Sequence, residues 1–120
     1  MPITLEQVKQ AYRIAKEVKE GNMHIGDAKA YLHKNYKLNA GSAQTFIYVF
    51  RDMLNGTRFT RGLARMPAHY YLTQILADYG NLALSQALKA FMEHITYYED
   101  RRQTTMHGLR EVHQKFSVMV

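Results

Sequence analysis

The segment 39–66 reads N-A-G-S-A-Q-T-F-I-Y-V-F-R-D-M-L-N-G-T-R-F-T-R-G-L-A-R-M, and it decides the fold class. Its apolar residues recur at spacings of three and four, which predicts a helix with one buried face over about residues 40–54. Asn39 or Ser42 is expected to cap this helix, because a short side-chain oxygen accepts from the unpaired N–H groups of the first turn. Gly56 can adopt the left-handed conformation that ends a helix. The segment therefore predicts a helix that leads into an arginine-bearing loop.

The same helical spacing continues on both sides of this segment. It predicts further helices over about residues 5–20, 25–35, 67–79, 82–102 and 106–117. Thr4 and Gln7 have the spacing of a capping box, Asn81 is expected to cap the longest helix, and a short strand is allowed only at Thr57 to Thr60. We expect an all-α fold, a compact orthogonal bundle of five or six helices that forms a single domain over residues 1–120.

The composition favours a protein without membrane segments that meets an anionic partner. No apolar run reaches the length that spans a bilayer, and the N-terminus lacks the order of a signal peptide. The chain has no cysteine, so no disulfide is expected, and we expect a cytoplasmic location. The net charge of +6 is uneven: residues 51–66 and 101–120 each carry four basic and one acidic group, whereas residues 67–100 carry one basic and four acidic groups. Such asymmetry favours an anionic partner, although many basic domains bind none.

The helices expected at residues 25–35 and 40–54, with the short turn between them, have the pattern of a helix-turn-helix. In that motif the second helix enters the major groove of DNA, and its first side chains reach base edges. The residues at those positions are Ser42, Gln44 and Thr45, and Lys29, Lys34 and Lys37 would approach phosphates. The alternative is two helices packed at an angle, in which Ser42 and Gln44 serve only as caps.

The arginine-bearing loop is the second candidate site. Arg58, Arg61 and Arg65 follow one another within eight residues, and guanidinium groups bind phosphate through two parallel hydrogen bonds. Phe59 can stack on an unpaired base. Arg101 and Arg102, in the basic C-terminal segment, complete the candidate nucleic-acid-binding residues. The alternative is that the loop arginines pair with acidic residues of the later helical region: Asp78, Glu93, Glu99 and Asp100.

Other patterns are less specific. The two tyrosine doublets place one ring toward the core and its neighbour toward the surface, which makes Tyr70 and Tyr97 candidates for a protein interface. The six histidines have no spacing typical of zinc ligands, so we predict no metal site. No glycine-rich phosphate loop and no interpretable catalytic triad is present. We therefore predict no cofactor, no catalytic residue and no enzymatic activity.

Four stretches resemble a helical domain that lies ahead of the HNH nuclease module in some bacterial restriction-type endonucleases. They read G-S-A-Q-T-F-I-Y-V-F-R-D-M-L-N-G (41–56), F-T-R (59–61), Y-Y-L-T-Q-I-L-A-D-Y-G (70–80) and A-L-K-A-F-M-E-H-I-T-Y-Y-E (87–99), and together they cover about half of the chain. The resemblance implies an accessory DNA-recognition or targeting module with Arg58 and Arg61 as its foremost binding residues. The 120 residues contain no HNH motif, so the resemblance carries over no nuclease activity. A free-standing copy is expected to be a separate subunit, or a phage or plasmid protein that mimics or blocks the larger system.

Two functions follow as predictions. The first is nucleic-acid binding, with duplex DNA as the foremost ligand, in a bacterial or phage restriction or defence context. The alternative is a small protein-interaction module, an inhibitor or adaptor, that binds an acidic surface of a larger bacterial or phage machine through Tyr70, Tyr97 and the same arginines. The sequence leaves homodimer formation open.

Overall fold

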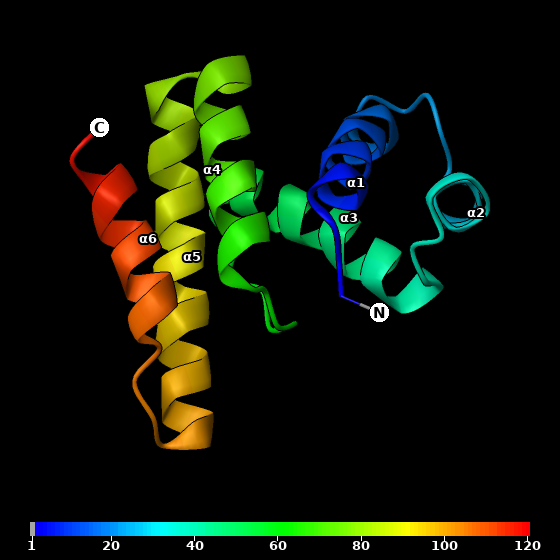
Figure 1. The fold of residues 1–120 in the computed structure, drawn as a ribbon. Helices are drawn as coiled ribbons and strands as arrows, with labels where there is room; N and C mark the ends of the chain where they lie inside the picture. The colour runs from blue at the N-terminus through cyan, green and yellow to red at the C-terminus, as the bar shows by residue number, and fades with distance from the viewer. Residues whose placement is uncertain (1) are drawn as a thin grey trace. The chain divides into compact units, whose positions relative to one another are not determined.

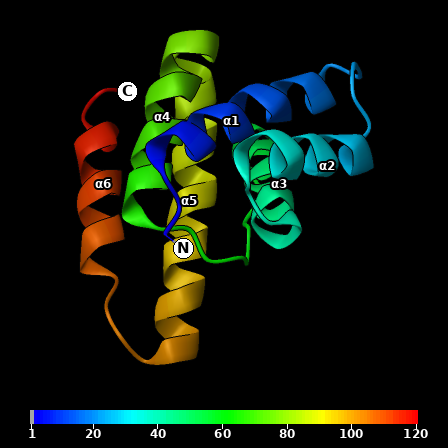
Figure 2. The ribbon, with the colours of Figure 1, turned by 45° about the vertical axis from the view of Figure 1, so that its right-hand side comes forward.

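The computed structural model describes residues 2–120, and these residues form six helices and no strand. The all-α prediction is therefore confirmed (Figures 1 and 2). The helices are α1 (Leu5–Lys19), α2 (Ile25–Tyr36), α3 (Ala40–Asn55), α4 (Arg65–Tyr79), α5 (Asn81–Arg102) and α6 (His107–Ser117). Two local expectations are wrong. The run Thr57–Thr60 lies in the loop between α3 and α4 and not in a strand, and Asn81 is the first residue of α5, with Gly80 at the cap position.

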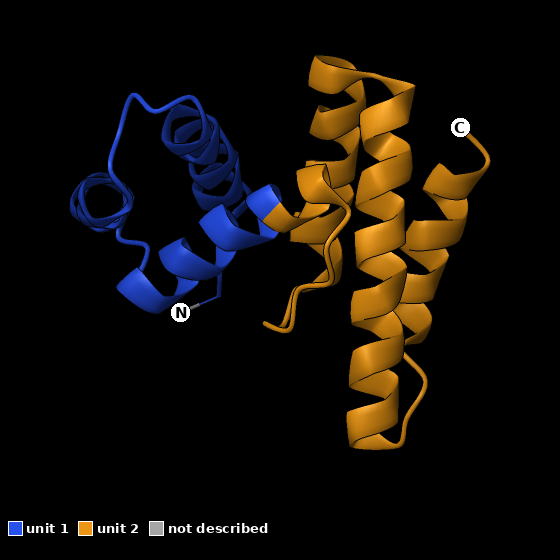
Figure 3. Ribbon diagram, turned by 180° about the vertical axis from the view of Figure 1, so that it is seen from behind, with its two compact units in different colours: residues 1–51 blue, residues 52–120 orange. Residues whose placement is uncertain are grey.

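Contacts within the chain divide it into two compact units, residues 1–51 and residues 52–120 (Figure 3). The division falls inside α3, between Arg51 and Asp52. The expectation of a single domain stays a prediction, which one cooperative unfolding transition of the whole chain would support.

In the first unit, side-chain caps and a short turn define the helices. Thr4 and Gln7 form the predicted capping box at the start of α1. The N–H of Ser42 donates to Oδ1 of Asn39 at 2.8 Å, so Asn39 is the residue that caps α3. Lys37 ends α2 in the left-handed conformation, at a φ of 61°, and the buried Leu38 follows it. The turn from α2 to α3 is thus set by burial of an apolar side chain and by one cap.

In the second unit, α4, α5 and α6 each pack against the other two and lie alongside one another in Figures 1 and 2. Gly80, at a φ of 90°, provides the single-residue connection from α4 to α5. The core of the second unit contains large apolar side chains from all three helices: Tyr71, Leu72, Ile75, Leu84, Phe91, Ile95, Leu109, Val112 and Phe116. Within residues 2–120 no helix has the length and apolar character that crossing a bilayer would require.

The connection from α5 to α6 is fixed by one carboxylate. Glu99 accepts from Nε of Arg110 at 2.6 Å and from its NH2 group at 2.5 Å, and it also accepts from the N–H of Met106 at 2.8 Å. The guanidinium of Arg110, followed by the Met106 N–H, lowers the pKa of Glu99 to about 2. Glu99 therefore ties the last turns of α5 to the first turn of α6.

Candidate nucleic-acid interface

One side of α5 carries a group of aromatic and cationic side chains. His94, Tyr98 and Arg102 recur every four residues, as do Tyr97 and Arg101, which places these two neighbouring rows on one side of the helix. The loop of residues 57–64 lies against this face, as the following contacts show. The candidate site is built from these two elements, both in the second unit.

Phe59 anchors the loop to α5. Its side chain is only 3% exposed, and its ring stacks on the ring of His94 with centroids 4.2 Å apart. Nδ1 of His94 lies 2.8 Å from the carbonyl oxygen of Phe59. Because a carbonyl oxygen can only accept, this nitrogen must carry the proton. Burial lowers the pKa of His94, and the bond to Phe59 opposes that shift. The prediction that Phe59 stacks on a base is wrong, because its ring is buried and already stacks on the ring of His94.

Three arginines lie over the adjacent rings of Tyr97 and Tyr98, and Arg61 is exposed on the loop beside them. The guanidinium carbons of Arg58 and Arg101 lie 4.7 Å and 5.4 Å from the centroid of Tyr97, and that of Arg102 lies 5.1 Å from the centroid of Tyr98. These distances are typical of cation–π contacts. A Cβ atom at Gly62 would lie 3.6 Å from the hydroxyl of Tyr98, so the loop residue next to Arg61 borders the same tyrosine. We call this set the arginine–tyrosine cluster: Arg58, Arg61, Tyr97, Tyr98, Arg101 and Arg102.

None of these four arginines forms an ion pair with a described residue. Three nearby acids have other partners: Glu93 pairs with Lys89 at 3.0 Å, Glu99 with Arg110, and Glu111 with Arg65 at 3.0 Å. Asp100 is exposed and forms no ion pair with any of the four arginines among the described residues. All four arginines are exposed. The alternative interpretation required the loop arginines to pair with carboxylates of α5. Among the described residues, neither Arg58 nor Arg61 forms such a pair.

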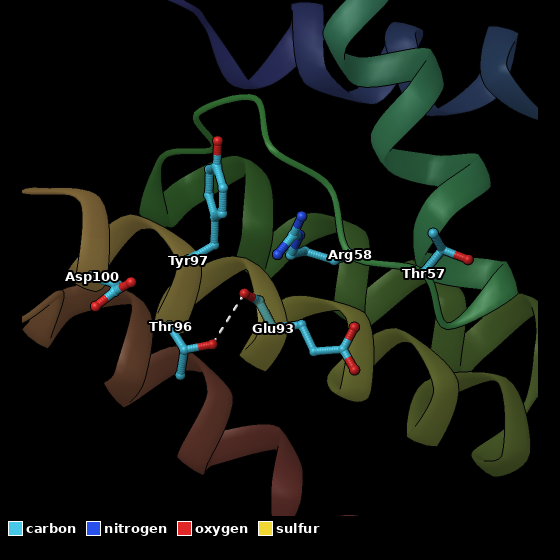
Figure 4. Close-up of a pocket in the computed structure, with 6 residues that line it drawn as sticks. All are labelled: Thr57, Arg58, Glu93, Thr96, Tyr97 and Asp100. Carbon is cyan, nitrogen blue, oxygen red and sulfur yellow. Dashed lines mark hydrogen bonds between the residues drawn. The ribbon is translucent and has the colours of Figure 1, made fainter.

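An open depression of ≈ 700 Å³ lies beside the cluster and is lined by Thr57, Arg58, Glu93, Thr96, Tyr97 and Asp100. Figure 4 shows the Arg58 side chain next to Tyr97, with Glu93 and Asp100 in the same surface. The hydroxyl of Thr96 donates to the carbonyl oxygens of Met92 and Glu93, each at 3.1 Å. The depression therefore carries mixed charge, with an exposed carboxylate at Asp100.

The remaining predicted residues lie outside this cluster. Arg65 is not in the loop but is the first residue of α4, and it pairs with Glu111 of α6. Tyr70 is half-buried on α4.

The helix-turn-helix candidates belong to the first unit. Lys34 and Lys37 are exposed, whereas Ser42, Gln44 and Thr45 are partly buried. Oε1 of Gln44 accepts from Nζ of Lys29 at 3.0 Å, and the hydroxyl of Thr45 donates to the carbonyl oxygen of Gly41 at 3.0 Å. Two of the three side chains expected to read bases, Gln44 and Thr45, are therefore already engaged within the chain.

Two residues of the cluster's framework were not identified from the sequence. The spacing of the histidines predicts no site at His94, and the tyrosine doublet places the ring of Tyr98 toward the core. The signal was present in their spacing, because His94, Tyr98 and Arg102 recur every four residues and Tyr97 and Arg101 do the same. What the sequence did not indicate is that the loop reaches this face of α5.

No family model, curated protein or solved structure matches this chain. The resemblance to the region ahead of an HNH module therefore stays a prediction.

Proposed function

We propose that the arginine–tyrosine cluster binds nucleic acid, with duplex DNA as its foremost ligand. The observation that carries this proposal is that three exposed guanidinium groups lie over two adjacent tyrosines, with a fourth exposed arginine, Arg61, on the same loop. None of the four is paired with a carboxylate among the described residues. A cation without a local counter-charge is available to an anionic ligand and pays no cost for breaking an internal ion pair.

The tyrosines prepare the arginines for binding. An arginine side chain loses rotamer freedom when it binds, and holding it in place beforehand reduces that loss. Tyr97 restricts Arg58 and Arg101 by cation–π contact, and Tyr98 restricts Arg102. Their N–H groups can then donate in pairs to phosphate oxygens.

In its full form the proposal describes a cytoplasmic, non-catalytic protein of a bacterial or phage restriction or defence system. That context comes from the resemblance described above. The affinity would come from phosphate neutralisation, which carries no sequence information by itself.

A second candidate function is binding to a protein partner. The depression beside Arg58 contains Glu93 and Asp100, and a half-buried tyrosine flanked by arginines is typical of the residues that dominate protein interfaces. A partner with a basic side chain could place it next to Asp100, which a nucleic acid could not do.

Fluorescence anisotropy with a labelled short duplex tests the first proposal. Each neutralised phosphate contributes about −0.9 to the slope of log K against log salt, so four arginines predict a slope of about −3.6. Binding should then weaken about 150-fold between about 50 and 200 mM salt. No binding at the lower salt concentration would overturn the proposal.

Asp100→Asn separates the two functions. Removing this carboxylate removes a repulsion for a phosphate chain, so duplex binding should tighten by about 1.5- to 5-fold. If the depression takes a basic group of a protein partner, the same variant should weaken that complex and leave DNA binding unaffected.

A further inference from the structure

We infer that the arginine–tyrosine cluster contacts only the phosphate backbone and reads no base, so that it binds duplexes of unrelated sequence equally well. The inference rests on the proposed function and adds the part of the nucleic acid that is recognised. It follows from what each aromatic ring of the cluster already contacts and from where the arginines lie in the fold.

Every aromatic ring in the cluster already has a partner within the chain. Sequence-tolerant stacking needs a side-chain ring with a free face, but Phe59 is buried and stacked on His94. The ring of Tyr98 lies 4.9 Å from His94 and 5.7 Å from Tyr97, centroid to centroid, and the guanidinium of Arg102 is over it. Tyr97 carries two guanidiniums. The rings hold the arginines, so stacking on splayed bases is not available.

The arginines are also poorly placed to read base edges. Direct readout in the major groove most often uses side chains from the N-terminal part of a recognition helix or from a two-stranded ribbon that enters the groove. Arg58 and Arg61 lie on the irregular loop between α3 and α4, and Arg101 and Arg102 lie in the last turn of α5. Phe59 fixes that loop against α5, which keeps it from extending into a groove.

Two guanidiniums at a single ring suit neighbouring phosphates. Arg58 and Arg101 lie around the centroid of Tyr97, and successive phosphates of one strand rise only about 3.4 Å along the duplex axis. One strand can therefore engage both arginines. Asp100, an exposed carboxylate in the lining of the adjacent depression, could accept from a cytosine amino group, and it is therefore the control residue for base readout.

The test is competition anisotropy at low salt with the intact chain and a panel of duplexes of equal length and unrelated sequence. Long-chain inorganic polyphosphate, which has no bases, serves as the second competitor. The inference predicts affinities within about threefold across the panel, whereas a site that reads bases loses about 5- to 160-fold per changed base pair. It also predicts that polyphosphate displaces the duplex completely, and that Arg58→Gln with Arg101→Gln weakens every duplex by the same factor.

The outcomes separate the two proposals. A spread above about tenfold across the panel, or polyphosphate that fails to displace a bound duplex, would overturn the inference and leave nucleic-acid binding in place; a spread that disappears in Asp100→Asn would assign the readout to that carboxylate. Polyphosphate that binds in calorimetry where no duplex binds would overturn the nucleic-acid proposal. Absence of binding to either polyanion would overturn both.

Discussion

Phe59→Ala tests whether one buried loop residue holds the candidate site together. The phenyl ring is 3% exposed and stacks on His94 at 4.2 Å, while the carbonyl group of the same residue accepts from the imidazole. The substitution removes the ring and leaves the backbone acceptor, so it isolates the contribution of packing.

The expected cost is large for a loop position. Truncating a buried phenylalanine to alanine costs about 3–5 kcal/mol, and about 0.5–1.5 kcal/mol of that can be assigned to the aromatic stack. A domain of this size has a total stability of about 5–15 kcal/mol, so the variant should remain folded but with a much smaller margin. Phe59→Leu keeps most of the buried volume and should lose less than about 1.5 kcal/mol.

Urea unfolding followed by far-UV circular dichroism measures this loss. With a slope of about 1.5 kcal/mol per molar urea, a loss of about 3 kcal/mol lowers the midpoint by about 2 M. Leu82→Ala is the control, because Leu82 is 80% exposed and its truncation should change the midpoint little.

The binding of the same variants provides the second readout. If Phe59 positions Arg58, then Phe59→Ala should weaken duplex binding under conditions where circular dichroism shows a folded chain, and Phe59→Leu should weaken it less. A loss of stability below about 1 kcal/mol for Phe59→Ala would refute the reasoning, because it would mean that the ring is not packed as described.

Three further predictions concern single residues. Burial lowers the pKa of His94 below 6.5, so the contribution of His94 to stability should be complete above pH 6.5 and decline as the pH falls below that value. Because the pKa values of His69 and His113 shift in the same direction, the readout is the difference in urea midpoint between the wild type and His94→Gln, measured at about pH 7.5 and at about pH 5.5. Equal differences at the two pH values would contradict the prediction. The pKa of Glu99, lowered from 4.5 to about 2, predicts stability that is present above pH 4.5 and lost as the pH falls toward 2, a decline that an acid titration of Glu99→Gln should show to be smaller. Asn39→Ala removes the cap of α3 and should cost about 1 kcal/mol in urea unfolding, whereas Asn39→Ser should restore most of it.

The helices could be predicted from the sequence because their signals are local. Apolar residues at spacings of three and four, the capping box at Thr4 and the glycine at Gly56 are read within a few residues of one another. The observed ends of α1, α2 and α3 accordingly lie within one residue of the expected ones. The sequence predicts Arg65 in the loop because no signal before Pro67 marks the start of α4, which has no side-chain cap.

The candidate site could be predicted only in part, since its contacts join residues that are far apart in the chain. The arginines are predicted by the local excess of positive charge and by their clustering in the sequence. The stacking of Phe59 on His94 joins positions separated by 35 residues, and one aromatic residue in a loop has no periodicity that would reveal its burial. The pairing of Arg65 with Glu111, 46 residues away, likewise left no pattern in the sequence.

The central claim is that the arginine–tyrosine cluster, and not the helix-turn-helix-like pair of the first unit, binds the phosphate backbone. The most direct test compares the salt dependence of duplex binding in two double variants that each remove two positive charges. These are Arg58→Gln with Arg101→Gln, and Lys34→Gln with Lys37→Asn, where asparagine suits the left-handed backbone of residue 37.

We expect the slope of log K against log salt to become less steep by about 1.8 in the arginine variant. In the lysine variant the slope should stay close to that of the wild type. A reduced slope in the lysine variant, with no change in the arginine variant, would contradict the claim and place the nucleic-acid site on the first unit.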